Sequence, residues 1–220
     1  MGKARVKETD QGIQGESNVE IYDRMLRRLR DKGWLDTKQI LQSGIVAGHA
    51  LEIGPGPGYL GLEWLKATRN SRLTGLDISV DMIGAAKKNA GEYGFEDRAA
   101  YIESDAQKMP FEDETFDAVF SNGSLHEWAE PGIILDEILR VLKPGGKYHL
   151  SDLRRDMNPL MKWLLKKATR PKEIVPGLVT SINAAYTADE VRKLTAASKL
   201  NVFVVRRSAI GLSISGSKRV

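Results

Sequence analysis

The fold of this 220-residue chain is decided by the stretch His49-Ala50-Leu51-Glu52-Ile53-Gly54-Pro55-Gly56-Pro57-Gly58-Tyr59-Leu60-Gly61. Its pattern predicts a short apolar strand over residues 50–53, a Gly-Pro loop, and a helix over about 59–68. Glycines carry no Cβ that would hold a ligand away from the backbone. The first N–H groups of a helix lack partners within the helix, so a polar ligand can dock there. The stretch therefore predicts the first half of a nucleotide-binding unit.

The composition is that of a globular protein, with 41% hydrophobic and 28% charged residues. The chain has no cysteine, which excludes disulfides, thiolate metal sites and cysteine nucleophiles. Its three histidines show no ligand spacing, so we predict no metal site. The N-terminus lacks an apolar signal core, and no apolar run reaches the roughly 20 residues that cross a bilayer. We expect a cytoplasmic location.

Strand and helix patterns alternate along most of the chain. Strands are predicted at 50–53, 72–78, 100–103, 116–120, 147–151, 201–206 and 210–215, and helices separate several of them, at 59–68, 80–93, 131–142 and 187–198. The predicted fold class is α/β: a mostly parallel, seven-stranded, doubly wound sheet with a C-terminal antiparallel hairpin, N-terminal helices and a helical cover insert. We expect a flexible arm at 1–18 and a single domain at 19–220, with N-terminal helices at 19–46 and the insert at 154–186.

Small or polar residues follow four of the predicted strands. They are Gly54 to Gly58, Asp77-Ile78, Asp105-Ala106 and Ser121-Asn122. Open parallel sheets bind ligands at the carboxyl ends of their strands, so these residues are expected to meet at one site. Asp77 lies 19 residues after Gly58, close to the spacing of roughly 20 expected for a carboxylate that binds ribose hydroxyls.

The glycine spacing alone does not choose the ligand, because residues 56–61 also match the dinucleotide pattern G-x-G-x-x-G. A hydride-transfer enzyme needs a proton donor as well. None of the six tyrosines has a lysine four residues later, which removes the Tyr/Lys pair of short-chain dehydrogenases. The dinucleotide pattern also leaves the polar ends of the third and fourth strands without a role.

Five pieces of sequence, in order, are similar to the class I S-adenosylmethionine-dependent methyltransferases. They are residues 51–58 (LEIGPGPG), 76–79 (LDIS), 105–111 (DAQKMPF), 116–119 (FDAV) and 139–146 (LRVLKPGG). They most resemble the branch that contains ubiquinone and menaquinone C-methyltransferases and many small-molecule methyltransferases. The resemblance covers residues 47–152 and implies S-adenosylmethionine as the cofactor.

The resemblance also implies a role for individual residues. Glu52, the backbone of Gly54, Gly56 and Gly58, and Ser121 or Asn122 would contact the methionine part of the cofactor. Asp77 would bind the ribose hydroxyls and Ile78 would pack on adenine, while Asp105 and the Ala106 N–H would bind the adenine edge. Tyr22, on the helix before the sheet, would either close over the cofactor or pack in the core.

The methyl group of a sulfonium is already activated, so the enzyme's main task is to place a nucleophile in line within about 3–3.5 Å. A base is needed only where the acceptor must lose a proton. His126, directly after the fourth strand, is the candidate base; the alternative is a hydrogen-bonded structural histidine. His149 lies within the fifth strand and is expected to be structural.

The predicted acceptor is a small organic molecule. The fourth strand ends in Ser-Asn-Gly-Ser, not in the Asn/Asp-Pro-Pro-Tyr/Phe motif of amino-methylating DNA and protein enzymes. Residues 160–165 would either line an apolar acceptor pocket or pin the insert to the sheet. Two alternatives stay open: an RNA or protein methyltransferase, and a protein that binds the cofactor without turnover.

The chain has a net charge of +4, and part of its basic excess lies in residues 24–32, 162–172 and 206–207. Solvated helix faces explain them better than a nucleic-acid site, because aromatic residues are only 7% of the chain. The basic residues would otherwise hold an acidic or phosphorylated acceptor, or make transient contact with a membrane.

Overall fold

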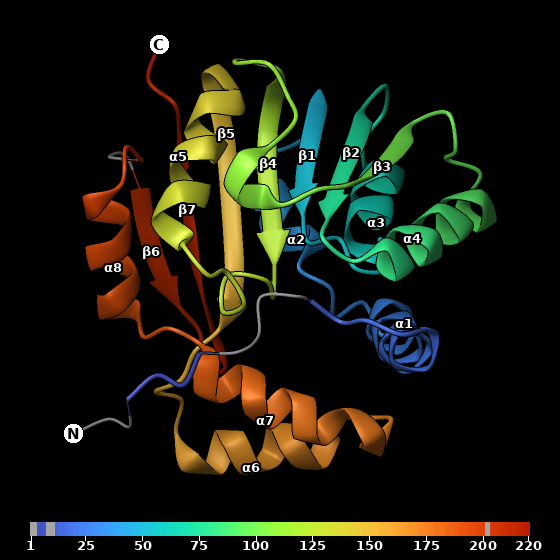
Figure 1. The fold of residues 1–220 in the computed structure, drawn as a ribbon, viewed down its shortest axis with the longest axis vertical. Helices are drawn as coiled ribbons and strands as arrows, with labels where there is room; N and C mark the ends of the chain where they lie inside the picture. The colour runs from blue at the N-terminus through green and yellow to red at the C-terminus, as the bar shows by residue number, and fades with distance from the viewer. Residues whose placement is uncertain (1–3, 8–11, 201–202) are drawn as a thin grey trace.

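The computed structural model describes residues 4–7, 12–200 and 203–220. Seven strands in this part of the chain form one sheet in the order β3-β2-β1-β4-β5-β7-β6 (Figure 1). The strands are β1 (His49–Ile53), β2 (Arg72–Asp77), β3 (Ala99–Glu103), β4 (Phe116–Asn122), β5 (Leu142–Leu153), β6 (Phe203–Arg207) and β7 (Gly211–Ser217). Strands β1 to β5 are parallel, and β7 runs antiparallel to both β5 and β6. The predicted fold class is confirmed. Residues 201–202 of the predicted hairpin lie outside the described residues.

Eight α-helices accompany the sheet in the described residues: α1 (Glu16–Asp31), α2 (Thr37–Gln42), α3 (Tyr59–Ala67), α4 (Val80–Tyr93), α5 (Pro131–Val141), α6 (Pro159–Ala168), α7 (Val175–Ala184) and α8 (Ala188–Ala197). Two 3₁₀ turns, η1 (Ala106–Lys108) and η2 (Lys172–Ile174), complete them. Ser79 caps α4 by accepting from the Met82 N–H, as its position before the helix predicts. A capping box of Thr187 and Glu190 opens α8.

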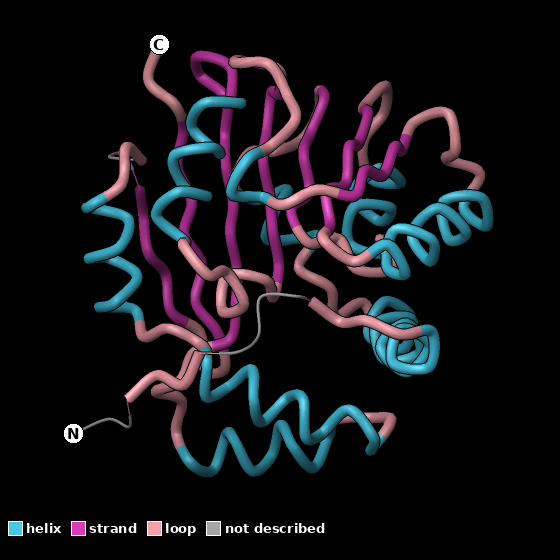
Figure 2. The backbone as a smooth tube through the Cα atoms, viewed as in Figure 1, coloured by secondary structure: helices cyan, strands magenta, loops and turns pink. Residues whose placement is uncertain are grey.

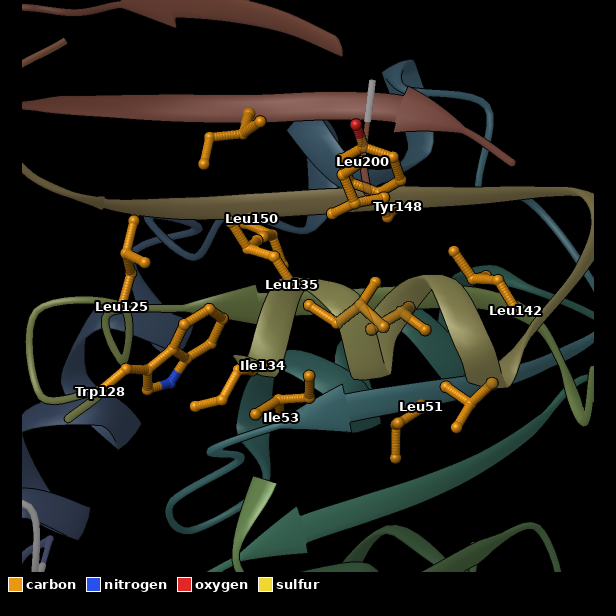
Figure 3. Packing of buried hydrophobic residues seen from close by; sticks show 14 of the residues in the cluster. Leu51, Ile53, Leu125, Trp128, Ile134, Leu135, Leu142, Tyr148, Leu150 and Leu200 are labelled. Atoms are coloured by element: carbon orange, nitrogen blue, oxygen red, sulfur yellow. The ribbon is translucent and has the colours of Figure 1, made fainter. Parts of the chain in front are cut away.

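The central strands are buried on both faces because successive side chains of a strand point to opposite sides. On β1, Leu51 and Ile53 belong to the core under α5 and α8, whereas Ala50 belongs to the core under α2, α3 and α4. Figure 3 shows the first of these cores, where Ile53 of β1 lies close to Ile134 of α5. Helices on both faces hold the carboxyl ends of the strands in one row.

Other parts of the chain gather at these carboxyl ends. Helices α1, α6 and α7 all lie beyond the ends of β1 and β4, and α6 is the layer farthest from the sheet (Figures 1 and 2). The connection between β5 and α8 therefore forms a helical insert over this end of the sheet. No helix among the described residues is long and apolar enough to span a bilayer.

The described parts of residues 4–15 also lie at this end. The Arg5 guanidinium donates to the backbone carbonyls of Ala184 and His126, and the Ile13 carbonyl accepts from the Ser79 hydroxyl at 2.7 Å. Residues 1–3 and 8–11 lie outside the described residues, and the flexibility of the arm at 1–18 stays a prediction.

Candidate functional site

The loop after β1 turns through three glycines with positive φ: Gly54 (64°), Gly56 (53°) and Gly58 (83°). A Cβ at Gly54 would collide with the Ser124 hydroxyl, and one at Gly56 would lie 3.4 Å from the Tyr22 ring. Side chains are excluded here both by backbone conformation and by space. The loop therefore offers its backbone to whatever lies above it.

A cavity of about 270 Å³ opens between this loop and the ends of β2 and β4. Eight of the predicted site residues line it: Tyr22, Gly54, Gly56, Asp77, Ile78, Asp105, Ala106 and Asn122. They come from the loop after β1, the ends of β2 and β4, the segment after β3, and α1. The strand-end residues thus meet around one space.

Asp77 is held in place by backbone donors. One carboxylate oxygen accepts from the Gly56 N–H at 3.1 Å and the other from the Ser79 N–H at 3.0 Å. Burial raises the pKa of Asp77 above its ordinary value, against the opposing effect of these backbone donors. The carboxylate therefore faces the glycine loop from the neighbouring strand.

Asp105 begins the 3₁₀ turn after β3 on the same cavity. Its carboxylate accepts from the Gln107 backbone N–H at 2.8 Å and from the Gln107 side-chain amide at 3.0 Å. Ala106 and Gln107 line the cavity beside it, and the side chain of Ile78 is exposed at the end of β2. Two carboxylates and one exposed apolar side chain thus surround this part of the cavity.

Glu52 does not line the cavity. It shares a strand face with Ala50, because the two are two residues apart on β1, whereas the cavity opens on the face of Ile53. Its carboxylate lies under α3, accepts from the Gly61 backbone and leaves Oε2 without a hydrogen-bond partner. Burial and the charge of Asp77 raise the pKa of Glu52 to about 8.

Gly58 and Ser121 also lie outside the cavity lining. A Cβ at Gly58 would lie 2.8 Å from the Tyr101 hydroxyl, so this glycine lets the loop pack on β3. The Ser121 hydroxyl donates to the Ile53 carbonyl at 2.7 Å and ties β4 to β1. Direct contact of these residues and Glu52 with a ligand stays a prediction.

His126 is buried beside the cavity and paired with a carboxylate. Its Nδ1 lies 2.9 Å from an Asp152 carboxylate oxygen, and its backbone N–H donates to the other oxygen at 2.7 Å. The next two residues, Glu127 and Trp128, line the cavity, whereas His126 does not. These contacts are those of the hydrogen-bonded structural alternative, and the role of His126 as a base stays a prediction.

Several residues of the lining were not predicted. Gly12 and Ile13 come from a segment without periodicity, so no pattern could place them. Glu127 follows His126 directly in the sequence, and its charge was a signal that could have been used. Burial raises the pKa of Tyr22, with Glu127 adding to the effect, so its phenol stays protonated at neutral pH.

Comparison with known proteins relates the part of the chain that carries this site to a protein family. Residues 51–150 match the family model described as "Methyltransferase domain". These residues, a little under half of the chain, are similar to a class I, Rossmann-like methyltransferase domain. The matched residues of this methyltransferase domain run from the middle of β1 into β5 and include the glycine loop, Asp77 and Asp105.

Two curated relatives and one solved structure are similar to this chain. A sterol 4-C-methyltransferase of Caenorhabditis elegans is 38% identical over 105 residues, covering 48% of this chain and 31% of the relative. A ubiquinone/menaquinone biosynthesis C-methyltransferase of Brucella anthropi is 27% identical over 150 residues, covering 66% and 56%. The alignments thus span a third to about half of these relatives. A putative S-adenosyl-L-methionine-dependent methyltransferase of Methanococcus maripaludis shares the fold, with a TM-score of 0.75 at 22% identity and coverage of 100% and 98%.

Proposed function

We propose that this methyltransferase domain binds S-adenosylmethionine in the cavity and transfers its methyl group to a small organic acceptor by in-line displacement. The observation that carries the proposal is the Asp77 carboxylate, which is anchored on the Gly56 N–H with Asp105 on the same cavity. The family match supports the proposal, as do the sterol and quinone acceptors in the names of the two relatives.

The residues present fit the nucleoside half of the cofactor. Each oxygen of an ionised carboxylate has two acceptor sites, so Asp77 can accept from two ribose hydroxyls while it keeps its bonds to Gly56 and Ser79. Ile78 offers an exposed apolar side chain to the adenine ring. The Asp105 carboxylate, which opens the turn containing Ala106, would accept from the adenine amino group.

The other half of the site is suited to a cation. Glu127 lines the cavity, and Tyr22 lies within the electrostatic influence of Glu127, Asp77 and Asp152. When bound, S-adenosylmethionine supplies a methyl group activated by a sulfonium charge. The carboxylates would stabilise this charge, while the Tyr22 ring and Trp128 limit the space available to water.

Titration calorimetry with S-adenosylhomocysteine, the demethylated product that lacks the sulfonium charge, tests the proposal. Asp77→Asn should weaken binding by about 1–3 kcal/mol because a charged acceptor is lost. Asp97→Asn, an exposed carboxylate before β3, is the matched control and should bind as wild type does. Absence of heat with the wild type would contradict cofactor binding, and unchanged affinity of Asp77→Asn would remove its role.

The acceptor is tested by following S-adenosylhomocysteine release from S-adenosylmethionine with pools of sterols, quinones, fatty acids, RNA or acceptor proteins. Release with one lipid class supports the small-molecule proposal. Release only with RNA or protein favours an RNA or protein methyltransferase. Binding without release in any pool favours a protein that binds the cofactor without turnover. The predicted cytoplasmic location stays a prediction that cell fractionation tests.

A further inference from the structure

Helix α6 turns apolar side chains to solvent. Leu160, Trp163 and Leu164 are 60%, 52% and 42% exposed, and none of the residues of α6 is buried. Positions i, i+3 and i+4 share one helix face, so these three side chains form a continuous apolar stripe. The helix packs on α7 and is the layer farthest from the sheet (Figures 1 and 2). The stripe therefore neither lines the cavity nor pins the insert to the sheet.

Positive charge flanks this stripe without any intervening acid. Residues 158–172 contain five basic side chains and no acidic one: Lys162, Lys166, Lys167, Arg170 and Lys172. The Lys167 ammonium lies 5.9 Å from the centre of the Trp163 ring. Basic residues beside exposed Trp and Leu are the composition of helices that lie in the plane of a membrane interface.

The basic surface continues beyond the helix. An open cleft between α1 and the α6–α7 connection is lined by Arg24, Arg27, Arg28, Arg170 and Lys172, with Asp31 and Glu173 as its acids. The cations outnumber the acids in this cleft by five to two. A surface that meets α6 at its C-terminal end would therefore meet further positive charge on α1.

We propose that α6 and this basic cleft dock the protein on the surface of an anionic lipid bilayer. The apolar stripe enters the interfacial layer, and the basic residues pair with lipid phosphates. A second copy of the chain fits the surface poorly, because self-association through α6 would bring five cations against five. RNA would leave the Leu and Trp side chains exposed. An anionic bilayer can bury the apolar stripe and pair with the basic residues at the same time.

Docking through α6 places the membrane one helix away from the cavity cover. Helix α7 lies between α6 and the sheet, and the carbonyls of Asn183 and Ala184, at its C-terminal end, accept from Val6 and Arg5. An apolar acceptor that leaves the bilayer at α6 would therefore arrive beside the segments around the cavity. This consequence rests on the proposed function, whereas the docking surface itself does not.

Vesicle co-sedimentation of the full chain without cofactor tests the docking surface. The vesicles are phosphatidylcholine alone, or phosphatidylcholine with about 30% phosphatidylglycerol, which mimics an anionic leaflet. We expect at least tenfold tighter binding to the anionic vesicles and its loss at roughly 0.5 M NaCl, where screening shortens electrostatic interactions to a few Å. Calorimetry with S-adenosylhomocysteine on the same sample separates failure of docking from failure of cofactor binding.

Two pairs of variants locate the surface. Trp163→Ser/Leu164→Ser and Lys166→Glu/Lys167→Glu should each lower the vesicle partition coefficient at least tenfold, with circular dichroism and S-adenosylhomocysteine affinity unchanged. The matched controls are Ile133→Ser, an exposed apolar residue on α5, and Lys87→Glu/Lys88→Glu, two exposed lysines on α4. Both controls should bind vesicles within about twofold of wild type, since a few exposed charges away from the contact change little.

Four results would overturn the proposal. They are equal binding to neutral and anionic vesicles, absence of binding to either, α6 variants that bind as the controls do, and a concentration-dependent dimer that Trp163→Ser dissociates. The last result would assign the stripe to a second copy of the chain. If the Ser variants unfold, the exposed Lys166→Gln/Lys167→Gln pair gives the same decision, because it leaves the apolar side chains in place.

Discussion

Replacing Glu52 by Gln should remove a contribution to stability that falls as pH rises through the neutral range. In the folded protein the carboxyl lies under α3 with one oxygen unpartnered, and burial together with Asp77 raises its pKa from 4.5 to about 8. In the unfolded chain the same group titrates near 4.5. Between these values folding takes up a proton, so the free energy of unfolding falls as pH rises and levels off above pH 8.

The size of this effect follows from the two pKa values. Each pH unit between them lowers the free energy of unfolding by about 1.4 kcal/mol. Allowing for half-ionisation at pH 8, Glu52 alone removes on the order of 3 kcal/mol between pH 5 and pH 8. This is a large share of the 5–15 kcal/mol typical of folded domains. Gln keeps the shape of the side chain and an acceptor for the Gly61 N–H but has no proton to lose.

Urea unfolding at several pH values between 5 and 8 measures the effect as the difference between wild type and Glu52→Gln. The control is Glu137→Gln, because the Arg140 hydrogen bond lowers the pKa of Glu137. The stabilisation by Glu137 is present above about pH 4.5 and is lost as pH falls through its folded pKa, so this variant should be destabilised without a changed pH dependence from 5 to 8. If Glu52→Gln lost as much stability as wild type between pH 5 and 8, the assigned burial of a protonated carboxyl would be wrong.

Three further changes test the site. Gly54→Ala should lower stability by about 1–3 kcal/mol and weaken S-adenosylhomocysteine binding, since the new methyl group collides with Ser124; urea unfolding and calorimetry measure both. Arg5→Ala removes donors to the carbonyls of Ala184, at the end of α7, and His126, after β4, and should speed S-adenosylhomocysteine release at least threefold in stopped flow, while exposed Lys7→Ala should not. Glu127→Gln should weaken binding of cationic S-adenosylmethionine at least threefold more than binding of neutral S-adenosylhomocysteine, and equal losses in calorimetry would remove its electrostatic role.

The elements that the sequence predicted best are those whose local signals agree with the fold. Ser79 and Thr187 have the side chains that cap helices, and Gly94 takes the left-handed conformation that ends α4. Helix α7 was not predicted, because Pro176 and Gly177 suggest a break. Both lie in its first turn, where a missing N–H costs no hydrogen bond.

The start of α1 and the length of β5 depend on tertiary contacts. Helix α1 begins at Glu16, three residues before the predicted Val19. Gly15, the residue before the helix, donates its N–H to the Asp81 carboxylate of α4. Strand β5 extends from Leu142 through the Pro-Gly-Gly segment, because a register shift in its pairing with β4 accommodates these residues. Neither contact leaves a pattern in the local sequence.

The residues of the candidate site likewise include some that sequence patterns predict and some that depend on tertiary contacts. The rule that ligands bind at the carboxyl ends of parallel strands placed Asp77, Asp105 and Asn122 on one cavity. The orientation of Glu52 also follows from the alternation of β1, but only once the face that carries the cavity is known. The segment around Ile13 reaches the site through long-range contacts, such as the hydrogen bond from the Ser79 hydroxyl to the Ile13 carbonyl. No periodic pattern in the sequence predicts such a contact.

The position of Ile13 and Arg5 has a consequence for the order of events in a catalytic cycle. One contacts the start of α4 beside Asp77, and the other joins the end of α7 to the segment after β4. Ile13 lines the cavity, so a nucleoside bound there would lie against this segment, and breaking the Ser79–Ile13 hydrogen bond would widen its way out. Loosening of the segment before α1 would then accompany the exchange of spent cofactor for fresh cofactor.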